Sequence, residues 1–162
     1  PDSMGAAIAL QFLQRSRLAD NVAGLMFDSP VLDWTATLAL AAQVRHLPWA
    51  LAAVGREVAR RRIGIDWRRF DQVQRATELR VPMLIVHGEA DTTVPVATSR
   101  AIARRRPDLV TLKTIAGAEH AESWKVDPSG CAEALRSFLS SLGVGSSAPA
   151  GATQPSTEPP RA

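Results

Sequence analysis

The sequence has a single cysteine, Cys131, in 162 residues. A lone thiol forms neither a disulfide within the chain nor a cysteine-based metal site. Apolar runs long enough for a membrane span are also missing, because Arg45 and His46 interrupt the one stretch of that length. No set of His, Asp and Glu shows a recognised ligand spacing, so we expect neither a metal nor another cofactor.

Basic and acidic side chains nearly balance. The 19 Lys and Arg residues against 16 Asp and Glu residues give a formal net charge of +3. Two arginine clusters, 60–62 and 104–106, resemble nucleic-acid patches. Each closes a predicted helix, where cations complement the negative end of the helix dipole, and no stacking aromatics accompany them. We therefore expect no nucleic-acid partner.

The length fits one domain followed by a tail. A chain of 162 residues can bury roughly 70% of its unfolded surface, which is enough for a hydrophobic core. Residues 1–142 carry the apolar patterns of that domain. Residues 143–162 are mostly Gly, Ser, Ala, Pro and Thr with almost no apolar bulk, so they cannot offset the entropy of ordering. We predict a disordered tail there.

Three short apolar segments predict strands. Residues 22–27 and 83–86 are continuous runs, typical of parallel strands that are buried on both faces, whereas 109–115 alternates as a strand nearer an edge would. Residues 4–18 and 128–142 carry helical apolar patterns. Strands separated by helices predict an α/β fold with a parallel sheet.

A long helical insertion, residues 31–80, lies between the first two predicted strands. Asp33 can cap a helix that runs to residue 47, Pro48 can open a second to about residue 62, and Asp66 can cap a third. Three tryptophans fall in this insertion: Trp34, Trp49 and Trp67. Because amphipathic helices bury aromatics in any case, a structural role is the alternative to a substrate role for each of them.

Three polar residues carry the chemistry that stands out. Ser3 opens the first helix, Asp91 follows the 83–86 strand, and His120 follows the 109–115 strand. A serine hydroxyl is a weak nucleophile at neutral pH and needs a base, itself oriented by a carboxylate, to take its proton. Open α/β sheets build sites at the carboxyl ends of their strands, so His120 and Asp91 are placed for these roles. Each residue taken alone also has a structural interpretation: Ser3 as a helix cap, Asp91 as a residue before a helix, and His120 as a histidine in a loop.

Residues 1 to about 142 resemble the α/β-hydrolase superfamily in its esterase, lipase and acyl-peptidase branch. The resemblance is strongest around residues 3–7, 87–95 and 117–124, and the chain order Ser, Asp, His is that of this superfamily. It implies the C-terminal portion of an α/β-hydrolase fold: about three parallel strands with flanking helices and a helical cap formed by the insertion. It also implies a serine hydrolase of carboxylic esters, or of amides or thioesters, that works through an acyl-enzyme on Ser3.

The resemblance assigns roles to further residues. The backbone N–H of Met4 would donate one hydrogen bond to the oxyanion, while the second donor comes in the family from an earlier loop. His87, which stands in a His-Gly pattern beside the acid, is usually structural in the family. Four tryptophans would line a pocket for a small-molecule or lipid-like acyl substrate: Trp34, Trp49, Trp67 and Trp124.

Alternatives to this assignment exist. Asp2 would be the nucleophile in dehalogenase-like members, but the elbow glycine falls two residues after the nucleophile, and Gly5 is two residues after Ser3. Asp28 could replace Asp91 as the acid, as the residue at that position does in some relatives. A noncatalytic fragment or pseudoenzyme with the helical cap as an interaction surface is the alternative from another functional class.

The beginning of the chain departs from the family pattern. The family's elbow reads Gly-x-Ser-x-Gly, and Pro1 stands at the position of the first glycine. We expect that the upstream half of the domain is missing, which would leave the fragment weakly active or inactive, with strands 22–27 and 83–86 at an exposed sheet edge. No signal or membrane segment is visible, so the default compartment is the cytoplasm, and the sequence leaves the oligomeric state open.

Overall fold

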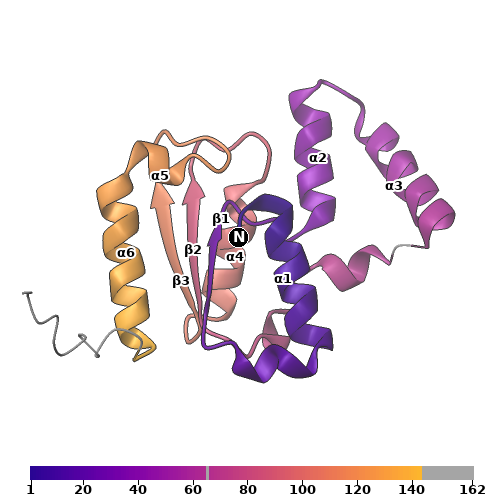
Figure 1. The fold of residues 1–162 in the computed structure, drawn as a ribbon. Coiled ribbons are helices and arrows are strands. Elements are labelled where there is room, and N and C mark those ends of the chain that lie inside the picture. Colours follow the sequence, from indigo (N-terminus) through magenta and orange to yellow (C-terminus); the bar gives the residue numbers. More distant parts are fainter. Residues whose placement is uncertain (65, 144–162) are drawn as a thin grey trace, which may run out of the picture.

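The computed structural model describes residues 1–64 and 66–143, which form a parallel sheet with helices on both faces (Figure 1). The described elements are the α-helices α1 (Ser3–Arg15), α2 (Trp34–Val44), α3 (Trp49–Ile63), α4 (Val96–Arg105), α5 (Ser123–Val126) and α6 (Pro128–Ser141), the 3-10 helices η1 (Arg17–Asn21), η2 (Trp67–Phe70) and η3 (Ala76–Glu78), and the strands β1 (Leu25–Asp28), β2 (Met83–Gly88) and β3 (Val110–Ile115). None of the described helices has both the length and the apolar character to cross a membrane. The predicted tail lies, apart from residue 143, outside the described residues.

The sheet has the order β1-β2-β3, and both neighbouring pairs are parallel. The central strand, β2, is buried along its whole length, and its side chains point alternately into two cores. Ile85 joins Leu10 of α1 and Ile102 of α4 on one face. Val86 joins Phe138 of α6 on the other. A strand covered on both faces needs no polar alternation, which explains its continuous apolar run.

The first predicted strand needs correction. It begins at Leu25, three residues later than the 22–27 prediction, because residues 22–24 lead out of η1 and pairing starts where Leu25 N–H donates to the Pro82 carbonyl (2.9 Å). Only Phe27 of β1 is fully buried, and β1 lies at an edge of the described sheet. Burial on both faces was therefore wrong for this strand.

Other boundaries differ less. The 83–86 strand extends to Gly88 and is central, so the prediction that it lies at an exposed edge was wrong. The alternating 109–115 segment forms the edge strand β3, as predicted. The helix predicted over 4–18 ends at Arg15, because the chain turns there into η1.

The residues before α1 lie against the carboxyl-terminal end of the edge strand β1. Asp2 forms a parallel bridge with Asp28, whose N–H donates to the Pro1 carbonyl (3.2 Å). Ser3 therefore starts α1 at the carboxyl-terminal edge of the sheet, where the loops after the other strands also emerge.

The 31–80 insertion forms helices, as predicted. Asp33 caps α2 by accepting from the N–H groups of Thr35 (2.7 Å) and Ala36 (3.1 Å), and α3 follows Pro48. The third predicted helix is only the short 3-10 turn η2. The α2–α3 hairpin projects to one side of the sheet (Figure 1), and its function as a cover over the site stays a prediction.

Candidate active site

Ser3 occupies a sharp turn between the extended first two residues and α1. Its φ angle is 45°, in the left-handed region that residues other than glycine rarely adopt. The Asp2 carbonyl accepts from Gly5 N–H at 2.8 Å, and a Cβ on Gly5 would lie 3.3 Å from the Pro1 Cβ. The turn thus forms with Pro1 in the place of a glycine and presents a half-buried serine at the sheet edge.

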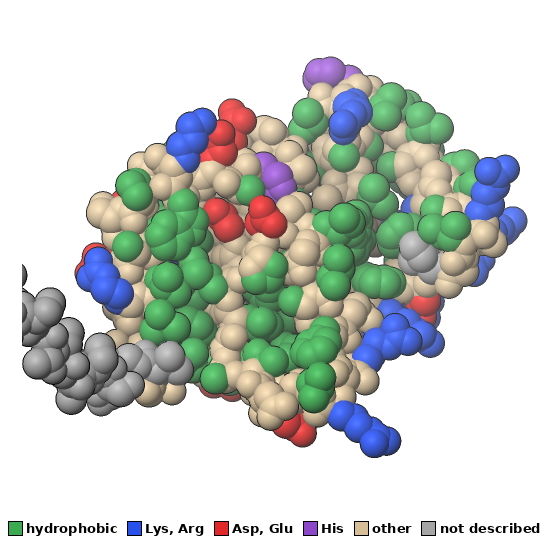
Figure 2. Space-filling view, viewed as in Figure 1, with side chains coloured by type: hydrophobic (Ala, Val, Ile, Leu, Met, Phe, Trp, Pro, Cys, Tyr) green, Lys and Arg blue, Asp and Glu red, His purple; other side chains and the backbone are tan. Residues whose placement is uncertain are grey.

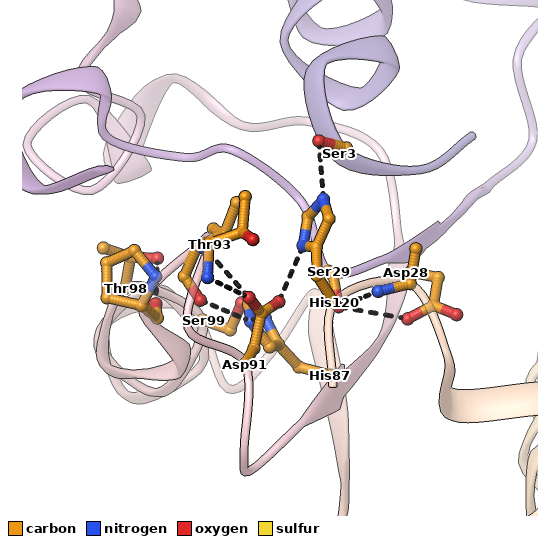
Figure 3. A network of polar contacts seen from close by, with 12 residues as sticks. Ser3, Asp28, Ser29, His87, Asp91, Thr93, Thr98, Ser99 and His120 are labelled. Carbon is orange, nitrogen blue, oxygen red and sulfur yellow. Dashed lines mark hydrogen bonds and ion pairs between the residues drawn. The ribbon is translucent and has the colours of Figure 1, made fainter. Parts of the chain in front are cut away.

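His120 bridges Ser3 and Asp91 (Figure 3). It lies in the loop between β3 and α5, with Nε2 2.9 Å from Ser3 Oγ and Nδ1 2.8 Å from Asp91 Oδ2. The nitrogen that faces the carboxylate carries a proton, so in the neutral ring Nε2 is an acceptor. Its lone pair points at the serine hydroxyl, which is the arrangement a general base requires.

Asp91 is a buried carboxylate in the loop after β2, with an exposed side-chain fraction of 0%. Its Oδ1 accepts from the N–H groups of Thr93 and Val94, both at 2.8 Å, while Oδ2 faces His120. Burial alone would raise the pKa of Asp91, but hydrogen bonds from His87, Val94, His120 and Thr93 outweigh it and hold the pKa well below its usual range. The group is therefore ionised at neutral pH and stabilises positive charge on the neighbouring imidazole.

The loop after β3 is anchored to the end of β1. Ala121 N–H donates to Ser29 Oγ (3.2 Å), and Ser123 Oγ donates to Asp28 Oδ1 (2.7 Å). Asp28 thus holds the loop, and the carboxylate hydrogen-bonded to the imidazole is that of Asp91. Of the two candidate acids from the sequence, Asp91 is the one that the structure brings to the histidine.

Several solved structures are similar to this chain in fold. The chain is similar to an esterase from Pyrococcus furiosus (TM-score 0.57, 21% identity, covering 86% of this chain and 51% of that chain). It is also similar to a monoacylglycerol lipase from Paleococcus ferrophilus (TM-score 0.60, 15% identity, covering 88% of this chain and 66% of that chain). A third similar structure is an α/β-hydrolase enzyme from a lagoon sediment metagenome (TM-score 0.56, 18% identity, covering 88% of this chain and 60% of that chain). The chain carries an α/β-hydrolase fold. At these identities the likeness establishes the fold, and function has to be argued from the site.

A family model matches part of this α/β-hydrolase fold. The serine aminopeptidase family, S33, matches residues 68–122. That segment contains Asp91 and His120, whereas Ser3 lies outside it. No curated protein sequence matches the chain. The chain spans about half the length of the Pyrococcus esterase.

The α/β-hydrolase fold does not gather the four predicted tryptophans around one pocket. Trp49, which is 82% exposed, and Trp67 line neighbouring grooves between α2 and α3. Trp124 lines a different groove, beside Pro1 and β1. Trp34 is the first residue of α2. The α2–α3 hairpin and α5, which contains Trp124, lie on opposite sides of the sheet (Figure 1), which explains the separation. A substrate role for these residues stays a prediction.

Sequence reasoning missed the serines that support the site. Ser29, Ser99 and Ser123 are all buried, and each hydrogen-bonds a residue at the sheet edge. A lone serine in a loop or a helix carries no distinguishing pattern. For His87, the prediction of a structural role agrees with its complete burial.

Proposed function

We propose that this chain contains the catalytic residues of a serine hydrolase that cleaves carboxylic esters, with amides and thioesters as alternative substrates. The observation that carries the proposal is the unbroken series of hydrogen bonds from Ser3 through His120 to Asp91, with the serine in a left-handed turn. The fold neighbours support it, because they include esterases and a monoacylglycerol lipase. The expected substrate is a small-molecule or lipid-like acyl compound.

Acylation begins when Ser3 Oγ attacks the substrate carbonyl carbon. His120 Nε2 takes the hydroxyl proton as the new C–O bond forms, and the ionised Asp91 stabilises the resulting imidazolium. The tetrahedral intermediate carries its negative charge on the former carbonyl oxygen. When it collapses, the imidazolium returns the proton to the leaving alcohol, and the acyl group stays on Ser3.

Deacylation repeats these steps with water. His120 takes a proton from water, the hydroxide attacks the acyl carbon, and the acid leaves as Ser3 regains its proton. The Met4 N–H lies in the first turn of α1, where backbone donors have no acceptor within the helix, and serves as one oxyanion donor. Loss of a single such donor costs roughly 100- to 1000-fold in turnover, so with one assigned donor we expect weak activity from this chain alone.

A noncatalytic interaction module is the second candidate. It is favoured by the apolar surface of the α2–α3 hairpin, since none of the residues of α3 is buried. Figure 2 shows apolar side chains on the surface of both the sheet body and the hairpin. The exposed apolar residues of α3 are Trp49, Leu51, Val54, Val58 and Ile63.

A fluorophosphonate probe separates the two candidates, because only an activated serine attacks its phosphorus. We expect one adduct, mapped by peptide mass spectrometry to Ser3, that is lost in Ser3→Ala. The matched control is Ser16→Ala, because Ser16 caps η1 at the far end of α1 and should leave labelling unchanged. Because we expect this chain to be a weak catalyst, labelling is followed over long incubation with excess probe. A complete absence of labelling under those conditions, or labelling that survives Ser3→Ala, would reject the hydrolase and favour the interaction module.

A further inference from the structure

Two serine–histidine pairs meet at one oxygen of Asp91 (Figure 3). The first is the pair of Ser3 and His120. In the second, His87 Nε2 lies 3.3 Å from Asp91 Oδ2, and His87 Nδ1 lies 2.8 Å from Ser99 Oγ. The two histidines turn opposite ring nitrogens toward the carboxylate, since His120 uses Nδ1. Among the described residues, these two histidines are the titratable groups that contact Asp91.

Burial distinguishes the two pairs. The His87 side chain is 0% exposed and Ser99 is also completely buried, whereas His120 is 24% exposed. A substrate can therefore reach His120 but not His87. Any contribution of His87 to the reaction must act through Asp91.

The surroundings of His87 determine which nitrogen carries its proton. Nε2 faces two acceptors, the Val94 carbonyl at 3.2 Å and Asp91 Oδ2 at 3.3 Å. It must therefore be a donor. In the neutral ring Nδ1 is then an acceptor, and the Ser99 hydroxyl donates to it. The donors therefore all point one way: the Ser99 hydroxyl donates to His87, and His87 Nε2–H points toward the Val94 carbonyl and the Asp91 carboxylate.

We propose that His87, oriented by Ser99, is a positioning residue that fixes the plane of the Asp91 carboxylate for His120. This inference rests on the proposed function. The side-chain torsion that turns a carboxylate is soft, so a buried contact on Oδ2 besides His120 restrains the carboxylate plane independently of the histidine that it has to orient. Thr93 and Val94 N–H groups donate to Oδ1, and the buried His87 Nε2, which also donates to the Val94 carbonyl, approaches Oδ2 at 3.3 Å. Without it, Oδ2 retains only the partially exposed His120 as its partner.

Nuclear magnetic resonance tests this role without requiring catalysis. The chain has three histidines, so single substitutions assign every imidazole signal. We expect a low-field resonance from the His120 Nδ1 proton that is lost in Asp91→Asn. It should shift and broaden in His87→Leu and recover in His87→Gln, whose amide N–H can replace the Nε2 donor. The exposed His46 provides the control, His46→Leu, which should leave the resonance unchanged.

Fluorophosphonate labelling adds the kinetic comparison. His87→Leu should slow the labelling of Ser3 by roughly 10- to 100-fold, as loss of an orienting partner does, while His87→Gln restores most of the rate. If His87→Leu does not fold, judged by thermal unfolding, Ser99→Ala removes the donor to Nδ1 and should broaden the same resonance.

The outcomes separate the two proposals. An unchanged His120 resonance in a folded His87→Leu protein, or in Ser99→Ala if His87→Leu does not fold, would overturn the positioning role. If the wild-type chain is not labelled but the resonance responds to His87→Leu, the proposed function fails and the positioning role stands.

Discussion

Replacing Asp91 with asparagine is the most informative single change, because the structure dictates how the new amide must sit. Oδ1 accepts from two backbone N–H groups at 2.8 Å, so the amide oxygen has to take that position. The NH2 group then replaces Oδ2 and faces the Nδ1 of His120, which donated to the carboxylate. Two donors cannot share a hydrogen bond, so the imidazole must carry its proton on Nε2, which points at Ser3.

The expected loss follows from this change of tautomer. With its proton on Nε2, His120 cannot accept the hydroxyl proton of Ser3, and the change in a triad of this kind costs about 10⁴-fold in turnover. That factor corresponds to about 5 kcal/mol of activation free energy. The new NH2 group can donate to the deprotonated Nδ1 of His120, but it also faces the buried His87 Nε2, which lay 3.3 Å from Oδ2 and is a donor as well. Loss of the carboxylate acceptor there should lower the free energy of unfolding by about 1–3 kcal/mol.

Fluorophosphonate labelling of Ser3 at neutral pH measures the kinetic effect, and denaturant unfolding measures the effect on stability. Asp28→Asn is the matched control, because Asp28 is the second carboxylate at this sheet edge and bonds Ser123 instead of His120. We expect its labelling rate to stay within about tenfold of wild type, since the triad keeps its tautomer. A labelling rate of Asp91→Asn within about tenfold of wild type would refute the role of Asp91 as the orienting acid.

Three further predictions test the fold and the electrostatics of the site. Because the folded-state pKa of Asp91 lies well below its ordinary value of 3.8, its stabilising contribution is present at neutral pH, begins to fall as pH approaches 3.8, and continues to fall down to the lowered pKa. Denaturant unfolding should therefore show a weaker acid dependence in Asp91→Asn, and equal dependence in both proteins would contradict the shift. Ser3→Gly should be more stable than Ser3→Ala by about 1 kcal/mol, and so unfold at a higher temperature, because glycine adopts the φ of 45° without strain. A glycine variant that is less stable than the alanine variant would argue against a strained turn. Gly88→Ala should destabilise the protein by about 1–3 kcal/mol, because the new Cβ would lie 2.3 Å from the Ala118 carbonyl oxygen. The control is Gly55→Ala on α3, whose Cβ would meet no atom within 4 Å and which should raise the free energy of unfolding by up to about 1 kcal/mol. Similar melting temperatures for the two variants would contradict the close packing of the β3–α5 loop.

Local sequence was sufficient to predict a strand or a helix start where the structure depends only on neighbouring residues or where both faces of the segment are buried. Residues 83–86 of β2 are all apolar because both faces of the strand are buried, and Asp33 and Pro48 mark helix starts through their effect on neighbouring residues. The same reasoning misjudged where the strand in residues 22–27 begins and how far it is buried, because an apolar run does not reveal where pairing starts or which segments cover its faces. Pairing and sheet order are decided by segments far away in the chain.

In the candidate site, too, the sequence predicted some features and the tertiary structure decided the others. The sequence by itself predicted that Asp91 and His120 would meet at one sheet edge, since each follows a predicted strand of a parallel sheet, while the resemblance to α/β-hydrolases implied that Ser3 would join them. Only the tertiary structure decided that Asp91 and not Asp28 contacts His120, and that His87 and Ser99 stand behind Asp91. The hydrogen bonds of His120 join residues 29 and 117 positions apart. Contacts across such separations follow no periodicity, so they become visible only when the packed strands bring the loops together.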